Sequence, residues 1–468
     1  MMELKMKPRV VVAGASGFVG RGMLKALAPH YNVMGLSRKP FRDGYTWRQC
    51  DLFSLLEAEE ALEGADYAIY LVHSMMPSAR LTQGRFEDMD LILADNFARA
   101  AKKAGVKQII YLGEIIPECQ ELSMHLRSRL EVEETLGAHG VPVTALRSAL
   151  IVGAEGPTFS ILVETIKRVP VMTFSPWKRS LVQPIALADV LAIFQYCIGN
   201  PSTYNQSFDI GGPDVLTYGQ MIMETAGILG YKRRFMKNPF YSFRLASYLL
   251  SLITGTPRAL VYPIVESLRF DMVAKDLRLQ ERMDLKGSSF AEAVKVSLAE
   301  TKGQLPRGSV AEKKKRIQSQ GILNVRSVQR LPLPENKDAD WVARHYAEWL
   351  PKFFGTLIKV KVDEQGNCSF YFGLLPKPLL ELTFSSERSS KDRPLYYITG
   401  GLLAQPFNKE FRGRLEFRQV LEGKYVLAAI HDFIPALPWF FYNLTQAPIH
   451  LWVMKSYGRH LKKMLIPN

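Results

Sequence analysis

Long apolar runs are missing from this 468-residue chain: no stretch of about 18 or more uninterrupted apolar residues is present to cross a lipid bilayer. The amino terminus, "MMELKMKPRVVVAGASG", has no secretory apolar region followed by a small-residue cleavage site. We therefore expect a cytoplasmic protein without a transmembrane helix.

Cysteine is also scarce, with four residues and no C-x-x-C pair. This spacing excludes a disulfide framework and indicates no zinc site, and no other metal site is expected. We expect reduced, buried thiols at all four positions, which are Cys50, Cys119, Cys197 and Cys368.

Acidic residues are few: the chain has 45 aspartates and glutamates but 60 lysines and arginines, so its net charge is +15. Such a charge suits nucleic acid, an anionic membrane surface or a phosphorylated cofactor. The chain has no zinc-finger spacing, no RNP-like aromatic strand and no basic zipper, so nucleic acid is not an expected partner. A hydrophobic share of 47% is typical of a soluble globular protein, and the length suggests two or three domains.

Residues 8–150 repeat a short β-branched run followed by an amphipathic stretch. The runs "RVVVAGA", "NVMGLS", "YAIYLVHS", "QIIYLGE" and "VTALRSALIVG" predict buried strands with helices between them. Strands that alternate with helices predict an α/β fold, a doubly wound parallel sheet covered on both faces. Residues 155–303 are more helical, as expected of a small substrate lobe within a nucleotide-binding domain of residues 1–305.

The remaining chain predicts a second domain after a spacer. Residues 306–335 are polar and basic and predict a linker. After residue 336 the apolar pattern has a period of two, as in Leu380, Leu382 and Phe384, which predicts an antiparallel meander with one face buried. With a final helix that has one apolar and one basic stripe, residues 336–468 are expected to form an α+β domain.

The stretch "VVVAGASGFVGRGMLKAL" is the strongest chemical signal. Gly14, Gly17 and Gly20 follow a predicted strand and open a predicted helix, the setting in which such glycines bind a dinucleotide. Gly14 permits the tight turn, Gly17 the approach of the pyrophosphate to the helix N-terminus, and Gly20 the packing of helix on strand. The alternative is a structural turn without a ligand. The neighbouring residues expected at the cofactor are Ser16, Phe18, Val19 and Arg21.

The end of the second strand distinguishes the two nicotinamide cofactors, because an acid there binds the ribose 2′-hydroxyl and a base the 2′-phosphate. Here the chain reads "GLSRKP", with Ser37, Arg38 and Lys39 and no acidic residue. We therefore expect NADP(H) to be favoured over NAD(H), with Arg21 as a further cation. Alternatively, these cations only decorate the surface.

Over residues 8–303 the chain resembles the atypical, epimerase-like branch of the short-chain dehydrogenase/reductases. The resemblance rests on the G-x-x-G-x-x-G turn, "YLVHSM", "LVQPIALADVL" and "FDIGGPDVLTY". It implies an NAD(P)-binding Rossmann fold, with Asp51 and Leu52 near the adenine and His73 and Ser74 where the chain passes the cofactor. Plain loop packing is the alternative for His73 and Ser74.

The whole chain is similar to a bacterial group of two-domain proteins in which this fold precedes a DUF2867 domain. That domain is in turn similar to the START and polyketide-cyclase-like (SRPBCC) proteins, which have a helix-grip fold. The likeness is carried by "HLRSRLEVE", "GVPVTALRSALIVG" and "GGPDVLTY", with weaker support from "RGRLEFRQV" and the final helix.

The family's catalytic helix reads Y-x-x-S-K-x-x-x-E, in which tyrosine gives a proton to the carbonyl and lysine holds the nicotinamide ribose. In the same register this chain has His125, Ser128, Arg129 and Glu133. The resemblance therefore implies His125 as proton donor and Arg129 as cofactor ligand, since histidine exchanges protons near neutral pH and arginine keeps its charge.

The family's catalytic serine at the end of the fifth strand is absent, because "YLGEI" places Gly113 and Glu114 there. Glu114 would act as an acid if burial raised its pKa. A surface-loop carboxylate is the favoured interpretation.

Two functions follow from the resemblance. The first is an NAD(P)H-dependent oxidoreductase that reduces a lipophilic carbonyl or a quinone-like substrate. The alternative is a non-catalytic NAD(P)H-binding sensor or assembly factor, which the loss of both tyrosine and serine would suit. The identity of the substrate and the oligomeric state are not indicated.

The segment "PALPWFFYN" places Trp439, Phe440, Phe441 and Tyr442 just before the basic final helix. It predicts either peripheral contact with an anionic membrane or uptake of a lipid-like ligand. The aromatic core of a helix-grip fold is the interpretation we favour.

Overall fold

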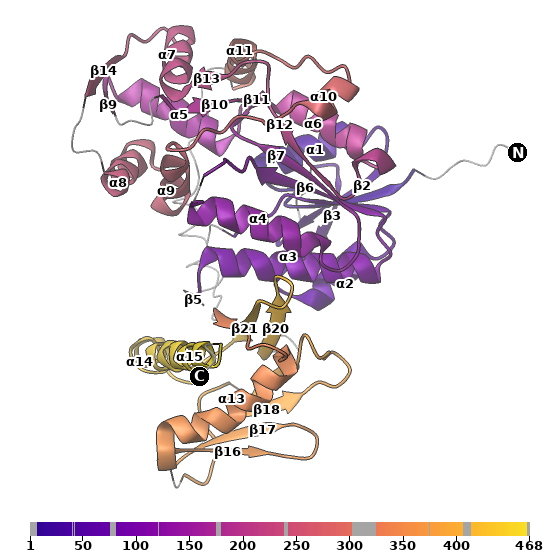
Figure 1. Ribbon diagram of the computed structural model, residues 1–468, viewed down its shortest axis with the longest axis vertical. Coiled ribbons are helices and arrows are strands. Elements are labelled where there is room, and N and C mark those ends of the chain that lie inside the picture. Colours follow the sequence, from indigo (N-terminus) through magenta and orange to yellow (C-terminus); the bar gives the residue numbers. More distant parts are fainter. Residues whose placement is uncertain are drawn as a thin grey trace, which may run out of the picture. The chain divides into compact units, whose positions relative to one another are not determined.

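The computed structural model describes residues 7–39, 41, 43–74, 81–119, 121–174, 179–237, 242–301, 324–373, 375–405 and 413–465. The chain divides into two compact units (Figure 1). Unit 1 consists of residues 1–76 and 93–314, and unit 2 of residues 77–92 and 315–468. None of the helices in the described ranges is long and apolar enough to cross a membrane.

Unit 1 is built on a seven-stranded sheet whose strands all run parallel. Short β-branched runs form its strands; in β1, four of the five residues are buried. β1 lies between β4 and β2, where the order of the strands reverses, so the predicted doubly wound fold is confirmed. In sheet order the strands are β12 (Gln206–Ile210), β7 (Val143–Ser148), β6 (Gln108–Glu114), β4 (Tyr67–Tyr70), β1 (Arg9–Ala13), β2 (Asn32–Ser37) and β3 (Thr46–Gln49).

Helices cover both faces of this sheet (Figure 1). On one face, α1 (Phe18–Leu27) and α6 (Leu187–Cys197) share a core with the strands, in which Leu24 and Phe194 meet Val10. On the other lie α2 (Leu55–Leu62), α4 (Met124–Gly137) and the unit 1 part of α3 (Phe86–Lys103). Cover on both sides explains why the strands are apolar throughout rather than alternating.

The lobe that follows is mainly helical and has its own core. Phe159, Val182 and Phe290 pack there together with Leu126 of α4, so the lobe lies beside the helix that carries His125. Its helices are α5 (Pro157–Arg168), α7 (Tyr218–Ile228), α8 (Phe243–Thr254), α9 (Arg258–Ser267), α10 (Arg278–Arg282) and α11 (Phe290–Glu300). Its strands pair in twos: β8 (Ile151–Val152) with β11 (Ile185–Ala186), β9 (Val171–Phe174) with β14 (Arg234–Lys237), and β10 (Leu181–Val182) with β13 (Leu216–Thr217).

Unit 2 contains an eight-stranded sheet in which neighbouring strands run antiparallel, except for the parallel pair β15 and β5. The antiparallel meander predicted from the period-two pattern is confirmed, and β20 and β21 form a hairpin around "EGK". In sheet order the strands are β16 (Ile358–Val362), β17 (Cys368–Phe372), β18 (Leu380–Phe384), β19 (Leu395–Gly400), β20 (Arg414–Val420), β21 (Tyr425–Phe433), β15 (Val325–Pro332) and β5 (Leu81–Gln83).

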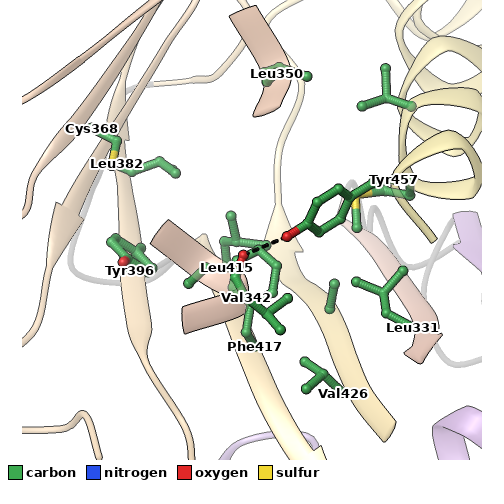
Figure 2. Packing of buried hydrophobic residues seen from close by; sticks show 14 of the residues in the cluster. Leu331, Val342, Leu350, Cys368, Leu382, Tyr396, Leu415, Phe417, Val426 and Tyr457 are labelled. Atoms are coloured by element: carbon green, nitrogen blue, oxygen red, sulfur yellow. Dashed lines mark hydrogen bonds between the residues drawn. The ribbon is translucent and has the colours of Figure 1, made fainter. Parts of the chain in front are cut away.

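Among the described residues, the helices that pack on this sheet include α13 (Ala339–Phe354), the short α14 (Trp439–Leu444) and the carboxy-terminal α15 (Gln446–Lys463). Their apolar residues form one core with Leu415, Phe417 and Val426 of the sheet. Figure 2 shows Tyr457 of α15 in this core, where its hydroxyl donates a hydrogen bond to the carbonyl oxygen of Val342 at 2.8 Å. This bond connects α15 to α13. The likeness of this domain to the DUF2867 and helix-grip proteins stays a prediction.

Two expectations about unit 2 need correction. Part of the range predicted as a linker is a strand, since β15 occupies Val325–Pro332; residues 306–323 of that range lie outside the described residues. The prediction of one buried face is also wrong for β20, because Glu416 and Arg418 are buried as completely as Phe417 between them. Burial is possible because these charged residues pair with one another, with Nη2 of Arg418 2.9 Å from Oε1 of Glu416.

Candidate functional site

The turn after β1 requires glycine at two of its three glycine positions. Gly14 has a φ of +81°, and a Cβ there would lie 2.8 Å from the carbonyl oxygen of Leu71. At Gly20 on α1, a Cβ would lie 2.6 Å from the Cα of Ala15. The fold itself therefore accounts for both residues.

Gly17 is different, because its backbone does not need a glycine. Its φ of −78° and ψ of 177° are open to any residue, and the atom nearest to an added Cβ is the Gly14 carbonyl oxygen at 3.2 Å. Gly17 is the N-cap of α1, and no side chain in the described part of the chain caps this helix. The first turn of α1 has no acidic residue. Its N–H groups and the positive end of the helix dipole thus fit a phosphate group, as the sequence predicts.

Phe18 and Val19 face the protein. The Phe18 ring packs on the loop after β8, where a Cβ added to Gly153 would lie 2.7 Å from Phe18 Cε2. Val19 packs against the core shared by α1 and the sheet. Both side chains are partly buried and support the turn, and contact of these two residues with a cofactor stays a prediction.

Arg21 has partners that the sequence did not suggest. Its Nη1 donates to the carbonyl oxygen of Ser16 at 2.8 Å, and its Nη2 forms an ion pair with Glu155. Both side chains of the pair are about half exposed. A cofactor phosphate would have to compete with Glu155 for this guanidinium.

The other residues expected around the adenosine lie at or beside the end of β2. Arg38 and Lys39 are exposed there. The carbonyl oxygen of Ser37 accepts a hydrogen bond from the backbone N–H of Cys50 at 2.9 Å. This bond brings the loop after β3 alongside β2, together with its two predicted adenine-site residues, Asp51 and Leu52.

The catalytic positions meet where β6 ends and α4 begins. His125 lies in the first turn of α4, whose N-cap Ser123 accepts a hydrogen bond from the N–H of Leu126 at 3.2 Å. Nε2 of His125 is 2.6 Å from Oε1 of Glu114, the last residue of β6. The side chain of His125 is 6% exposed and that of Glu114 30%. The interpretation of Glu114 as a surface-loop carboxylate is therefore wrong.

The charges around Glu114 determine its protonation state. Burial opposes its ionisation, but the nearby positive charges of His125, Arg129 and His73 and the hydrogen bond from His125 outweigh it, and they lower the pKa of Glu114 below its usual value. The alternative expectation of an acid with a raised pKa is also wrong. Glu114 is thus a carboxylate at neutral pH.

Arg129 lies one turn after His125 on α4 and is buried. Tyr111 of β6 donates a hydrogen bond from its hydroxyl to the carbonyl oxygen of Arg129 at 3.2 Å, which holds this part of the helix against the sheet. Glu133, one turn further along, forms a two-pronged ion pair with Arg147 of β7 at 2.7 and 2.9 Å. Arg147 and Glu133 fix the register of α4 on the strands.

Two further residues belong to the cluster. His73 follows β4 and is exposed, yet it is close enough for its charge to lower the pKa of Glu114, so the structure brings it to the site. Tyr218, at the start of α7, was not predicted. Burial raises the pKa of Tyr218, and the charge of Glu114 adds to that rise. The only sequence signal for Tyr218 is its place at the end of "GGPDVLTY".

These residues form one cluster near the carboxyl ends of β4 and β6 and the start of α4. Its members are Glu114, His125, Arg129, His73 and Tyr218. In doubly wound sheets, ligands bind at these carboxyl ends, beside the point where the strand order reverses. A carboxylate, an imidazole and a guanidinium side by side can exchange a proton with a bound molecule and hold hydroxyl or anionic groups. The described residues include no group of three or more His, Cys, Asp or Glu side chains placed to hold a metal ion.

Comparison with known proteins places these features in a family context. Residues 10–131 match the NAD dependent epimerase/dehydratase family. A curated relative, the auxiliary protein GraX of Staphylococcus aureus, is 34% identical over 143 residues, which are 30% of this chain and 43% of GraX. The matched region thus spans less than half of that relative's length.

Two solved structures have a similar fold over 61% and 64% of this chain. An NADPH-dependent quinone oxidoreductase from Escherichia coli, solved with NADPH, has a TM-score of 0.50 and 18% identity, over 61% of this chain and 98% of its own. A UDP-glucose 4-epimerase from Thermotoga maritima, solved with UDP-glucose, has a TM-score of 0.50 and 15% identity, over 64% of this chain and 100% of its own. The segment that carries the glycine turn and the Glu114–His125 pair is therefore similar to the NAD dependent epimerase/dehydratase family.

Proposed function

We propose that the protein is an NAD(P)H-dependent oxidoreductase of the atypical short-chain dehydrogenase/reductase type, which reduces a lipophilic carbonyl or a quinone-like substrate. The observation that carries the proposal is the buried His125, 2.6 Å from the ionised Glu114 and one helical turn from Arg129. This arrangement retains a proton donor and a cation at the two positions where the family has tyrosine and lysine.

The nicotinamide cofactor supplies the hydride when it is bound. The N-terminus of α1 at Gly17 would hold the pyrophosphate, and Arg129 would donate hydrogen bonds to the nicotinamide ribose. His125 would give a proton to the substrate oxygen. Glu114 orients the imidazole of His125 through Nε2. When the imidazole is protonated, the carboxylate of Glu114 balances its positive charge. Arg129 keeps its charge throughout and takes no part in proton exchange.

A preference for NADP(H) is supported by the end of β2. Arg38 and Lys39 are exposed there, and the sequence "GLSRKP" offers no carboxylate to a ribose 2′-hydroxyl. The structurally similar Escherichia coli enzyme is named an NADPH-dependent quinone oxidoreductase, which also supports the choice of a quinone-like substrate. We expect Arg38→Ala with Lys39→Ala to weaken NADPH binding much more than NADH binding.

Oxidation of NADPH by the purified full-length chain, followed by absorbance with a panel of quinones and lipophilic carbonyl compounds, tests the proposal. We expect His125→Ala to lower kcat by about 10²- to 10⁴-fold while the affinity for NADPH is retained. Glu114→Gln should lower kcat less, because the imidazole remains. The exposed His30, replaced by alanine, is the matched control and should leave turnover unchanged. NADPH binding without oxidation by any compound of the panel would contradict the proposal.

A second candidate is a protein that binds the cofactor without turning it over, as a sensor or an assembly factor. It is favoured by the replacement of both hydroxyl groups that the family uses, since Glu114 and His125 stand in their places. The name of GraX, an auxiliary protein, points the same way. In this case NADPH would raise the unfolding temperature of the chain, and His125→Ala would change no reaction rate.

A further inference from the structure

Several large apolar side chains are exposed on α14 and α15. Tyr442 lies in the core of unit 2 and Trp439 packs against it, so these two residues are core aromatics, while the helix-grip fold of that core stays a prediction. Phe440 and Phe441 point the other way. The large apolar side chains that are 48–69% exposed on these two helices are Phe440, Phe441, Leu444, Ile449 and Trp452.

These residues form one stripe that continues into basic residues. Phe441 and Leu444 are exposed on α14, which ends at Leu444, and on α15 exposed positions recur with helical spacing from Pro448 to Trp452. The same spacing then reaches the exposed Lys455, Arg459 and Lys462, so the apolar half of the stripe lies toward α14 and the cationic half toward the end of α15. We call these residues, with Phe440, Ile449 and Lys463, the α14–α15 face.

The end of α13 widens the apolar half of this face. The Trp452 ring lies 5.0 Å from that of Phe353 and 5.8 Å from that of Phe354, both only partly buried. Leu357, just after α13, is exposed as well. Unit 2 thus presents several aromatic rings side by side, a larger apolar area than scattered surface residues explain.

The charged side chains between residues 433 and 468 have a single sign. Residues 433–468 contain no aspartate or glutamate, whereas the α14–α15 face carries Lys455, Arg459, Lys462 and Lys463, all exposed. Two copies of such a face would repel each other through these cations, which argues against self-association. An apolar aromatic surface continued by lysine and arginine matches the interface of an anionic bilayer, where rings enter the acyl boundary and cations meet the headgroups.

We propose that the α14–α15 face binds peripherally to the surface of a lipid bilayer that contains anionic lipid, with α15 lying along that surface. Phe440, Phe441 and Trp452 enter the headgroup region, and the four cations contact lipid phosphates. The proposal does not depend on the redox activity proposed above, since it uses only residues of unit 2.

Unit 1 offers a competing surface that serves as a matched control. On α8, Leu245, Tyr248, Leu249 and Leu252 share one face and are 47–62% exposed. That helix has a single cation, Arg244, and no tryptophan or exposed phenylalanine stripe. Its apolar exposure resembles that of the α14–α15 face, but the continuous row of cations is absent.

Co-sedimentation of the purified full-length chain with vesicles tests the proposal. The vesicles are of pure phosphatidylcholine or of an equimolar mixture of phosphatidylcholine and phosphatidylglycerol. We expect the wild type to sediment with the mixed vesicles and much less with the neutral ones. Phe440→Ser with Phe441→Ser and Trp452→Ser should weaken this binding at least about tenfold, whereas Leu249→Ser with Leu252→Ser should leave it unchanged.

A second variant keeps the test valid if the aromatic variant does not fold. Lys455→Gln with Arg459→Gln and Lys462→Gln alters only exposed side chains, and it too should weaken binding to the mixed vesicles at least about tenfold. The proposal is overturned if the wild type stays in the supernatant with both vesicles, or if only the α8 variant loses binding. It is equally overturned if the wild type self-associates through this face, seen as a dimer that the aromatic variant converts to a monomer without lipid.

Discussion

At the scale of the residue, substitutions of Gly17 and Gly20 distinguish a glycine needed for ligand binding from a glycine needed for folding. We expect Gly17→Ala to fold normally and to bind NADPH at least about tenfold more weakly, because the new methyl group would occupy the approach to the helix N-terminus. Gly20→Ala should instead destabilise the chain by about 1–3 kcal/mol, because its methyl group would press on Ala15. NADPH titration and urea unfolding of both variants distinguish the two roles. Wild-type affinity in Gly17→Ala would mean that no pyrophosphate approaches this turn.

Glu416 is the residue on which the buried charges of unit 2 depend. Its carboxylate lies 2.7 Å from Arg393, 2.9 Å from Arg418 and 3.1 Å from His431. Burial opposes its ionisation, but the charges of Arg393 and Arg418 and the hydrogen bond with His431 hold the pKa of Glu416 well below its usual value. These arginines would be buried without compensation if Glu416 lost its charge.

We therefore expect Glu416→Gln to lower the free energy of unfolding by about 3–5 kcal/mol. Because the pKa of Glu416 is depressed in the folded state, its contribution is present above the unfolded value of 4.5 and is lost as the pH falls through the folded pKa. Urea unfolding at neutral pH measures the effect. Arg344→Gln, at a side chain 68% exposed in an ion pair of the same unit, is the control and should cost less than about 1 kcal/mol. Equal effects of the two variants would refute the role of Glu416.

The single residues that the sequence predicted are those set by short spacings. The glycine turn and the positions of His125 and Arg129 follow from neighbours on one strand and one helix. The partner of His125 does not, because Glu114 reaches it only through the way β6 and α4 meet. Tyr218 comes from a helix about a hundred residues away, and no local pattern links it to Glu114.

At the scale of the element, α15 contacts β15 through His450, a histidine that is neutral in the folded state. Nε2 of His450 lies 3.2 Å from Oγ of Ser327 on β15, and burial lowers the pKa of His450 to about 4. Below pH 6.5 the unfolded chain binds a proton that the folded chain does not. Stability from this residue is therefore complete above about pH 6.5 and falls as the pH drops toward 4, by up to about 3 kcal/mol.

We expect His450→Gln to remove that part of the pH dependence. Burial also lowers the pKa of His345, His431 and His460, so a weaker slope should remain in the variant. Urea unfolding of the full chain between pH 4 and 7 measures both slopes, with the exposed His30→Gln as the control. Identical slopes for wild type and His450→Gln would exclude the residue as the source.

Elements with a regular period were the predictable ones. The parallel strands of unit 1 are continuous apolar runs, and the meander of unit 2 alternates as expected. In β20, however, alternation gave the orientation of each side chain but not its burial. Glu416 and Arg418 on the second face pair with each other, and Glu416 also pairs with Arg393, which precedes β19, and with His431 of β21. A pattern of polarity along one strand cannot reveal partners that arrive from another.

At the scale of the whole molecule, the chain passes between the two units more than once. Residues 77–92 leave unit 1, contribute β5 and the first turns of α3 to unit 2, and return. β5 pairs in parallel with β15, and Oδ1 of Asp88 on α3 lies 2.6 Å from Nε of Arg330. The sequence did not indicate this crossing, because a three-residue strand, "LTQ", has no period to detect.

Unit 2 should therefore be incomplete when it is cut from the chain at its carboxy-terminal segment alone. A fragment of residues 324–468 leaves the edge of β15 uncovered and deprives Arg330 of Asp88, so we expect it to aggregate or to unfold without a cooperative transition in urea. Joining residues 77–92 to residue 324 through a flexible glycine and serine linker should restore a cooperative transition. The same fusion with Asp88→Asn, which keeps β5 but removes the charge, should be less stable by about 3–5 kcal/mol. If the fragment without residues 77–92 unfolds as cooperatively as the fusion and at the same urea concentration, β5 and α3 contribute nothing to the folding of unit 2.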